Sequence, residues 1–200
     1  MIGTRTVEGF EARTLASAAE GGLEAAFVPG AGMVGCSLRH RGEELLGRRG
    51  GLRAYVTERG TMGIPLLHPW ANRIAERRFP IAGREVAIEP PAPLSTDPNG
   101  LAIHGLVSAA TGWRVERHDA TAHGAVLVAE LDFGADPARV AAFPFPHRIV
   151  IEARLEGATL TITTTVRVTG DTPVPVAFGF HPYLRLPGVD RADWRVEIPV

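Results

Sequence analysis

The sequence predicts an all-β protein and, within that class, a large antiparallel β-sandwich. Several stretches of the chain alternate apolar and polar residues with a period of two, which is the pattern of a half-buried strand. The 23 glycines and 16 prolines are spread along the whole chain, as turns between short elements require. No apolar stripe with a period of 3.6 residues continues for about ten residues, as a long amphipathic helix needs. Many short strands with close turns favour a sandwich or a barrel.

The predicted strands follow one another in chain order from residue 23 onward. Threonine and valine are frequent in the later runs, as a pleated, half-buried surface prefers. The run 148–155 places Ile149 and Ile151 on one face, and the run 160–168 does the same with Ile162 and Val166. The three residues between these two runs, Glu-Gly-Ala, are typical of a hairpin. The predicted strands are residues 23–28, 33–40, 85–88, 113–117, 125–133, 148–155 and 160–168.

Helical signals are few, and the end of the chain is unusual. Asp136 and Pro137 indicate one short helix, with Asp136 as the N-cap and Pro137 at the first helical position. Residues 194–200 alternate like the beginning of another strand, at which the chain stops. Either this is a final edge strand, or the chain is the front part of a longer protein. We expect residues 1–200 to form a single β-sandwich domain that is incomplete at its C-terminus.

Composition excludes several classes of protein. The formal net charge of −1 argues against a nucleic-acid partner. All 21 basic residues are arginines, so Schiff-base chemistry on lysine and the lysine-containing P-loop are excluded. The one cysteine, Cys36, forms no intramolecular disulfide, and we expect a buried thiol. No apolar stretch approaches the length of a membrane span or of a signal peptide, which favours a cytoplasmic protein without a membrane partner.

The segment 63–74 concentrates polar functional residues in apolar surroundings framed by prolines. It contains His68, Trp70, Asn72 and Arg73. Arginine is a fixed fork of donors and asparagine both donates and accepts, which suits a ligand with many hydroxyl groups. Trp70 offers a flat apolar surface for a sugar ring. The alternative is that Arg73 pairs with a carboxylate and Trp70 fills the core.

Two further segments each present a histidine. In 98–106 an Asn-Gly turn precedes His104, which is followed by a glycine that allows close approach of a ligand or another backbone. In 174–184 an apolar strand ends at His181, and a proline follows. An imidazole exchanges a proton near neutral pH without a large pKa shift. The alternatives are a core histidine at 104 and a solvent-facing one at 181.

The other histidines are interpreted as surface or turn residues, and Arg77 and Arg78 as a solvated charge cluster with Glu76. The histidines in this group are His40, His118, His123 and His147.

Together the three segments resemble the aldose 1-epimerase (galactose mutarotase) family. The resemblance rests on Asn-Arg-Ile at 72–74 followed by Phe79 and Gly83, on Leu-Ala-Ile-His-Gly at 101–105, and on Phe-His-Pro-Tyr at 180–183 before Leu186. It extends from about residue 20 to the end of the chain, and His-Pro-Trp-Ala-Asn-Arg-Ile is similar to a bacterial branch. The fold that it implies, a large antiparallel β-sandwich, agrees with the period-two pattern.

The resemblance implies an enzyme that interconverts the α and β anomers of a hexose by acid–base ring opening and reclosure. His181 is then the acid that protonates the ring oxygen, and His104 contacts the sugar near the anomeric centre. Asn72 and Arg73 hold hydroxyl groups, and Tyr183 lines the pocket beside the acid. The partner is a small sugar, and neither a metal nor an organic cofactor takes part.

One part of the family pattern is missing. The family's general base is a Glu near the C-terminus, and a sugar-binding Asp also comes late. Asp190, Asp193 and Glu197 follow His181 too closely to match either. We therefore expect the base beyond residue 200, and substrate contacts without efficient turnover if the chain ends there.

Three alternatives stay open. The first is a catalytically silent carbohydrate-binding protein on the same fold. The second is an epimerase of a phosphorylated hexose, for which Arg77 and Arg78 are available to bind phosphate. The third is a metal site formed by His68, His104 and His181, which ranks last because no nearby Cys, Asp or Glu completes a ligand motif.

Overall fold

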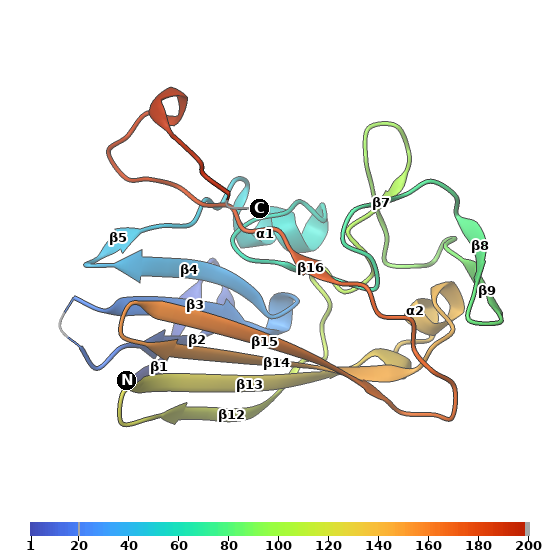
Figure 1. Cartoon of the computed structure of the whole chain (residues 1–200), viewed down its shortest axis with the longest axis horizontal. Helices are drawn as coiled ribbons and strands as arrows, with labels where there is room; N and C mark the ends of the chain where they lie inside the picture. The colour runs from blue at the N-terminus through green and yellow to red at the C-terminus, as the bar shows by residue number, and fades with distance from the viewer. Residues whose placement is uncertain (20, 199–200) are drawn as a thin grey trace.

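Two antiparallel sheets dominate the computed structural model, which describes residues 1–19 and 21–198 (Figure 1). The first sheet has five strands in chain order, and the second has four, also in chain order. The first comprises β1 (Ile2–Val7), β2 (Phe10–Ala16), β3 (Leu23–Val28), β4 (Val34–His40) and β5 (Glu43–Glu44). The second comprises β12 (Arg114–Ala120), β13 (Gly124–Asp132), β14 (His147–Glu156) and β15 (Thr159–Val168). The all-β antiparallel prediction is confirmed.

The β14–β15 hairpin forms where the alternating pattern places it. Leu155 lies opposite Leu160 in the register, and Gly157 in the turn between the strands has a φ of +55°. Every second residue of β14, beginning at His147, is buried. The corresponding face of β15 is only half-buried.

The β1–β2 hairpin was not predicted. Its charged and polar residues occur on both faces, and its only fully buried side chains are Ala12 and Leu15, so its alternation is weak. The pairing still runs over the full length of β1, from Ile2 opposite Leu15 to Val7 opposite Phe10. Backbone pairing with β3 and the burial of Val7, Ala12 and Leu15 therefore hold this hairpin in the sheet.

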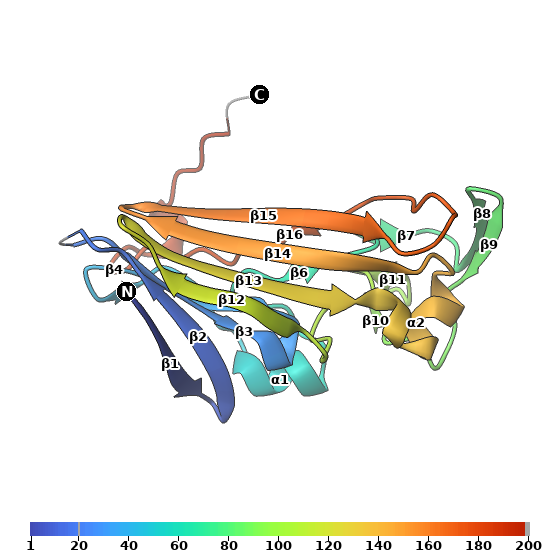
Figure 2. The ribbon, with the colours of Figure 1, turned by 90° about the horizontal axis from the view of Figure 1, so that it is seen from below.

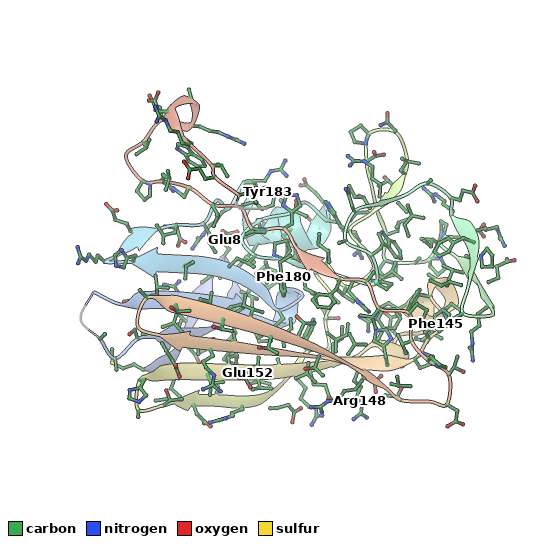
Figure 3. All side chains as sticks on the ribbon, viewed as in Figure 1. Glu8, Phe145, Arg148, Glu152, Phe180 and Tyr183 are labelled. Carbon is green, nitrogen blue, oxygen red and sulfur yellow. The ribbon has the colours of Figure 1, made fainter. Side chains whose placement is uncertain are left out.

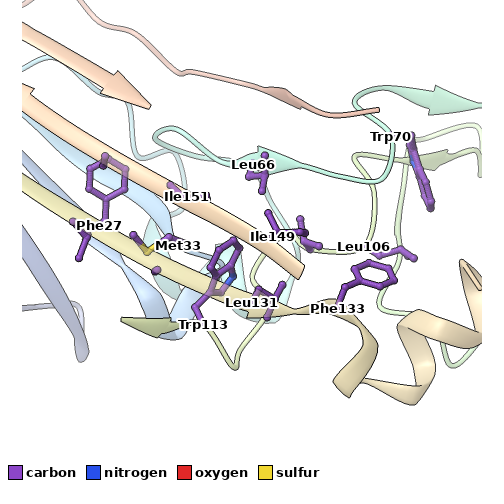
Figure 4. Packing of buried hydrophobic residues seen from close by; sticks show 14 of the residues in the cluster. Phe27, Met33, Leu66, Trp70, Leu106, Trp113, Leu131, Phe133, Ile149 and Ile151 are labelled. Carbon is purple, nitrogen blue, oxygen red and sulfur yellow. The ribbon is translucent and has the colours of Figure 1, made fainter. Parts of the chain in front are cut away.

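The main core lies between the two sheets. β13 contacts β2 and β14 contacts β3, and Figure 2 shows β12–β15 stretched across the strands of the first sheet. Phe27 of β3 packs in the same cluster as Leu127 of β13 and Ile151 of β14, all three 2% exposed or less. Figure 4 shows this cluster running from Phe27 at one end to Trp70 at the other.

A second cluster lies on the opposite face of the first sheet. The alternate residues of β3, Ala26 and Val28, pack there with Leu52 and Tyr55 of helix α1 (Gly51–Thr57). Glu8, labelled in Figure 3, accepts a hydrogen bond at 2.7 Å from the amide of Leu52 near the start of this helix. Strand β3 is therefore buried on both faces and fixes the layer order. Cys36 belongs to this cluster and is fully buried, as predicted, and its burial raises the thiol pKa to about 11.

Short elements gather beyond one end of the sheets (Figure 1). Helix α2 (Pro137–Ala142) begins as predicted, because the Asp136 carboxylate accepts from the amides of Ala138 and Arg139. The remaining short strands are β6 (Leu66–Leu67), β7 (Arg73–Ile74), β8 (Arg78–Ile81), β9 (Arg84–Ala87), β10 (Ser95–Thr96), β11 (Ala102–Ile103) and β16 (Gly179–Phe180). Most of these are too short to show a pattern in the sequence.

The predicted C-terminal strand does not form within residues 194–198, which have no strand pairing, and positions 199–200 lie outside the described residues. No helix in the described part of the chain is long and apolar enough to cross a membrane.

Candidate active site

The strand β16 brings His181 back to the segment that contains Asn72. β16 pairs with β6 in antiparallel register, Phe180 opposite Leu66. The same pairing continues outside the strands, because the His181 amide donates to the Pro65 carbonyl at 3.3 Å. A histidine that directly follows two short paired strands is thereby anchored through its backbone, with its side chain exposed.

A second short sheet brings His104 to Arg73. β11 pairs with β7, with Ile103 opposite Arg73, and the His104 amide donates to the Asn72 carbonyl at 3.3 Å. His104 has a φ of +67°, in the left-handed region that residues with a side chain seldom adopt. The left-handed backbone at this position turns the chain sharply at the edge of the cleft.

The three segments line one cleft with a volume of about 420 Å³. The ring centroids of His104 and His181 are 5.4 Å apart, and the rings lie edge to face. The cleft is lined by Leu67, Ala71, Asn72, Arg73, Ile103, His104, Phe180 and His181. The sequence-predicted residues Asn72, Arg73, His104 and His181 are therefore neighbours in space, although the roles assigned to them stay predictions.

The two imidazoles have different surroundings. His104 is half-buried, and its burial lowers the pKa of its ring below the ordinary value; the nearby His181 and Arg73 lower it further. A half-buried imidazole beside two potential cations favours the neutral form near pH 7. His104 thus offers a lone pair and one N–H to a ligand, whereas His181 lies at the exposed side of the cleft.

Arg73 is held by a carboxylate that the sequence analysis missed. The Asp97 carboxylate accepts from Arg73 Nε at 2.7 Å, and its other oxygen accepts from the amides of Asn99 and Leu101. The hydrogen bond from Arg73 is the main cause that lowers the pKa of Asp97, although burial opposes it. The sequence Asp-Pro-Asn-Gly at 97–100 indicates a turn. The contact of Asp97 with Arg73, however, forms only through the fold and has no signal in the sequence. Half of the Arg73 side chain stays exposed to the cleft.

Tyr183 lies behind His181 and not among the residues that line the cleft. Its ring stacks on that of His181 with centroids 4.8 Å apart. The Tyr183 hydroxyl contacts the Thr61 hydroxyl and accepts from Arg49 Nη1 at 3.2 Å. Figure 3 shows Tyr183 on the C-terminal segment close to α1. Thr61 and Arg49 are further residues that the sequence analysis missed, because nothing in their local pattern signals a contact with residue 183.

Two sequence interpretations are wrong. Trp70 is only 7% exposed and packs in the main core, so it presents no flat surface to a sugar. The alternative interpretation of segment 63–74 is confirmed for both residues: Arg73 pairs with a carboxylate, and Trp70 fills the core. His147 is not a surface residue: it is fully buried because it begins the inward-facing set of β14.

The three-histidine metal alternative finds no support in the geometry. The His68 ring contacts the Ala177 carbonyl at 3.1 Å and His147 at 2.8 Å, so both of its nitrogens are engaged away from the cleft. Within residues 1–19 and 21–198, no three His, Cys, Asp or Glu side chains gather in an arrangement that fits a metal ion.

The paired arginines at 77 and 78 lie outside the cleft lining. Arg78 is bound by Glu85 and Glu89, and Arg77 donates to the Gly100 carbonyl. These contacts agree with the interpretation of a solvated charge cluster.

The fold and the cleft together define an antiparallel β-sandwich of the galactose mutarotase-like class. A family model described as aldose 1-epimerase matches residues 19–198. The chain therefore belongs to the aldose 1-epimerase family. A search of curated proteins finds no match.

Solved structures have the same fold at low sequence identity. A galactose mutarotase-like protein from Clostridium acetobutylicum is 19% identical, with a TM-score of 0.79 over 96% of this chain and 56% of that one. A galactose 1-epimerase from Lactobacillus acidophilus is 13% identical, with a TM-score of 0.61 over 84% and 49%. An aldose epimerase homologue from C. elegans is 19% identical, with a TM-score of 0.60 over 89% and 52%. The chain thus spans about half the length of the solved structures that it matches.

Proposed function

We propose that this chain carries the acid side of an aldose 1-epimerase site, which interconverts the α and β anomers of a free hexose. The observation that carries the proposal is the meeting of two imidazoles, 5.4 Å between ring centroids, in a cleft that also contains Asn72 and Arg73. Membership of the aldose 1-epimerase family supports the same reaction class.

In the proposed reaction, the His181 imidazolium donates a proton to the ring oxygen while a base takes the proton of the anomeric hydroxyl. The bond from the anomeric carbon to the ring oxygen breaks, and its electron pair stays on that oxygen. The anomeric carbon and its hydroxyl oxygen become an aldehyde, which rotates. The reverse proton transfers then close the ring on the other face.

His104 and Arg73 have different tasks in this proposal. The neutral His104 ring hydrogen-bonds the sugar near the anomeric hydroxyl, consistent with its lowered pKa. Arg73 cannot lose its proton, so it orients hydroxyl groups without competing in the transfer. Asn72 accepts from Arg73 Nη1 at 3.2 Å, which leaves its amide N–H₂ free to donate to the sugar.

Polarimetry on freshly dissolved α-glucose or α-galactose tests the proposal. The protein is expected to accelerate mutarotation over buffer, and His181→Ala to lose most of that acceleration. His123→Ala, a change in an exposed turn, is the matched control and is expected to keep the full rate. An active protein in which His181→Ala leaves the rate unchanged would remove the acid assignment.

A catalytically silent carbohydrate-binding protein is the second candidate. The observation that favours it is that no carboxylate lines the cleft among the described residues. It predicts that ligand-observed NMR detects sugar binding that Arg73→Ala weakens, with no change in the mutarotation rate. Acceleration by the unaltered chain would reject this candidate.

A further inference from the structure

The strongest feature outside the cleft is a buried pair of imidazoles. His68 and His147 are 1% and 0% exposed, and their Nε2 atoms are 2.8 Å apart. His147 Nδ1 contacts the Phe145 carbonyl at 2.6 Å, and His68 Nδ1 contacts the Ala177 carbonyl at 3.1 Å. All four ring nitrogens are thus within hydrogen-bond distance of a partner.

These three contacts need more protons than two neutral rings possess. A carbonyl only accepts, so each Nδ1 contact requires an N–H, and the Nε2 contact requires a third. Two neutral imidazoles carry one N–H each. The pair therefore either carries a positive charge or leaves one contact without a proton.

Burial decides in favour of the neutral pair. It lowers the pKa of His68 to about 3, and repulsion from His147 adds to the effect. It also lowers the pKa of His147, near which lie the charged groups Asp132, which favours the cation, and Arg139, which opposes it.

The two shortest contacts are His147 Nδ1 with the Phe145 carbonyl, at 2.6 Å, and His68 Nε2 with His147 Nε2, at 2.8 Å. Two lone pairs would repel each other at these distances, so each of these contacts contains one of the two protons. The 3.1 Å contact of His68 Nδ1 with Ala177 is the one that lacks a proton.

The pair lies where the three cleft segments meet. The His68 carbonyl accepts from the Leu106 amide at 2.7 Å, two residues after His104. Its ring faces Ala177, which lies just before β16 and His181. His147 belongs to β14 of the large sheet, and its ring stacks on Phe133 with centroids 4.3 Å apart. The pair thus packs between the segments of both cleft histidines and the rigid core, with a hydrogen bond to the His104 segment through the His68 carbonyl.

We propose that His68 is a positioning residue for His104 and His181, held by a fixed relay in which His68 Nε2–H donates to His147 Nε2 and His147 Nδ1–H donates to the Phe145 carbonyl. The relay itself is a statement about the fold and needs no substrate. Its consequence for the rate rests on the proposed mutarotase function.

Nitrogen-15 NMR of the imidazole rings tests the relay on the unaltered protein at pH 7. The expected result is that His68 is protonated at Nε2 and not at Nδ1, and His147 at Nδ1 and not at Nε2. A His68 ring protonated at Nδ1, or a pair carrying three protons, would overturn the assignment. This measurement needs neither substrate nor mutation. It therefore tests the relay even if the protein has no epimerase activity.

His147→Phe tests the positioning role. Phenylalanine keeps an aromatic ring on Phe133 but removes the acceptor for His68 Nε2–H, so His68 is expected to change to the Nδ1–H form and donate to Ala177. The ring resonances of His104 and His181 are then expected to move, whereas the exposed His123→Gln leaves them in place. If mutarotation is catalysed, kcat falls by between about 10- and 100-fold with a smaller change in KM, because misplaced groups act mainly on the chemical step.

His147→Gln is the conservative rescue. Its side-chain carbonyl offers His68 Nε2–H a new acceptor, so the His68 form, the resonances of the cleft histidines and the rate are expected to return toward those of the unaltered protein. A His147→Phe variant that folds, with the cleft resonances and the rate unchanged, would reject the positioning role. Equal loss in His147→Phe and His147→Gln would instead assign the pair to stability alone.

Discussion

At the scale of single residues, the ion pair between Arg73 and Asp97 fixes the guanidinium that we propose binds the sugar. Asp97→Asn removes the charge that fixes Arg73 Nε, while the amide keeps an oxygen for the turn. We predict that the KM for the sugar, or its Kd, rises severalfold with a smaller change in kcat, because a guanidinium that orients hydroxyls binds ground state and transition state alike. Steady-state polarimetry measures both constants.

The matched control for this change is Asp119→Asn. Asp119 also accepts from an arginine Nε, that of Arg117 at 2.8 Å, but both side chains are about half exposed on β12. Exposed pairs of this kind contribute little. Equal effects of the two substitutions would show that Asp97 has no special relation to the cleft.

The buried His68 makes the folded protein sensitive to mild acid. Its pKa is lowered from 6.5 to about 3, so below pH 6.5 the unfolded chain binds a proton that the folded chain does not. Stability is unaffected above pH 6.5 and is lost as the pH falls from there toward 3. Between pH 6.5 and 5 this one group removes about 1 to 2 kcal/mol from the free energy of unfolding. Urea unfolding at the two pH values measures the loss. His68→Phe should reduce the difference in the free energy of unfolding between pH 6.5 and pH 5, even if it lowers stability at both pH values.

At the scale of elements, the turn after β11 depends on one glycine. Gly105 has a φ of +72°, and a Cβ there would collide with the His68 carbonyl. Gly105→Ala is therefore predicted to destabilise the protein by well over the roughly 1 kcal/mol typical of alanine at a left-handed position, and to displace His104.

Gly100→Ala separates the cost of a side chain at positive φ from the cost of the collision with His68. Gly100 has a similar φ of +78°, but a Cβ there meets nothing within 4 Å. It should therefore show the backbone cost alone, and urea midpoints of the two variants give the difference. If both variants lose the same stability, the close approach of His68 to Gly105 is not what holds the turn.

The elements also show what sequence patterns can and cannot reveal. The strands β13, β14 and β15 were predictable because their apolar and polar residues alternate, β3 because it is a short apolar run, and α2 because of its Asp-Pro start. The strands that build the cleft, β6, β7, β11 and β16, have two residues each, which is too short for any period to register. Motif order and spacing, not periodicity, identified the candidate residues that these strands bring into one cleft.

At the scale of the whole molecule, long-range pairing explains the remaining differences. Asp97 meets Arg73, and Tyr183 meets Thr61 and Arg49, only after the chain has returned across the sheets. His147 was misjudged for the same reason: its position after a proline suggests a turn, whereas the register of β14 points its ring inward. Residue types identified the candidate cleft histidines, but tertiary pairing supplies the residues that orient them.

Because the cleft joins segments from three distant parts of the chain, a sugar bound there should stabilise the fold as a whole. Unfolding separates those segments and abolishes the site, so binding raises the free energy of unfolding by RT ln(1 + [L]/Kd), about 2.7 kcal/mol at a sugar concentration about 100 times Kd. We predict that galactose or glucose raises the urea midpoint of the unaltered protein and does so less for Arg73→Ala.

Mannitol at equal concentration is the control for this last prediction, since excluded polyols stabilise any folded protein without binding. The part of the urea-midpoint shift that exceeds the shift in mannitol measures binding in the cleft. This part should saturate with sugar concentration, whereas the effect of exclusion grows steadily. Identical shifts for sugar and mannitol, in both the unaltered protein and Arg73→Ala, would mean that the three segments meet without forming a sugar site. The test reads binding through the stability of the whole molecule, so it remains informative if the chain binds a hexose without turning it over.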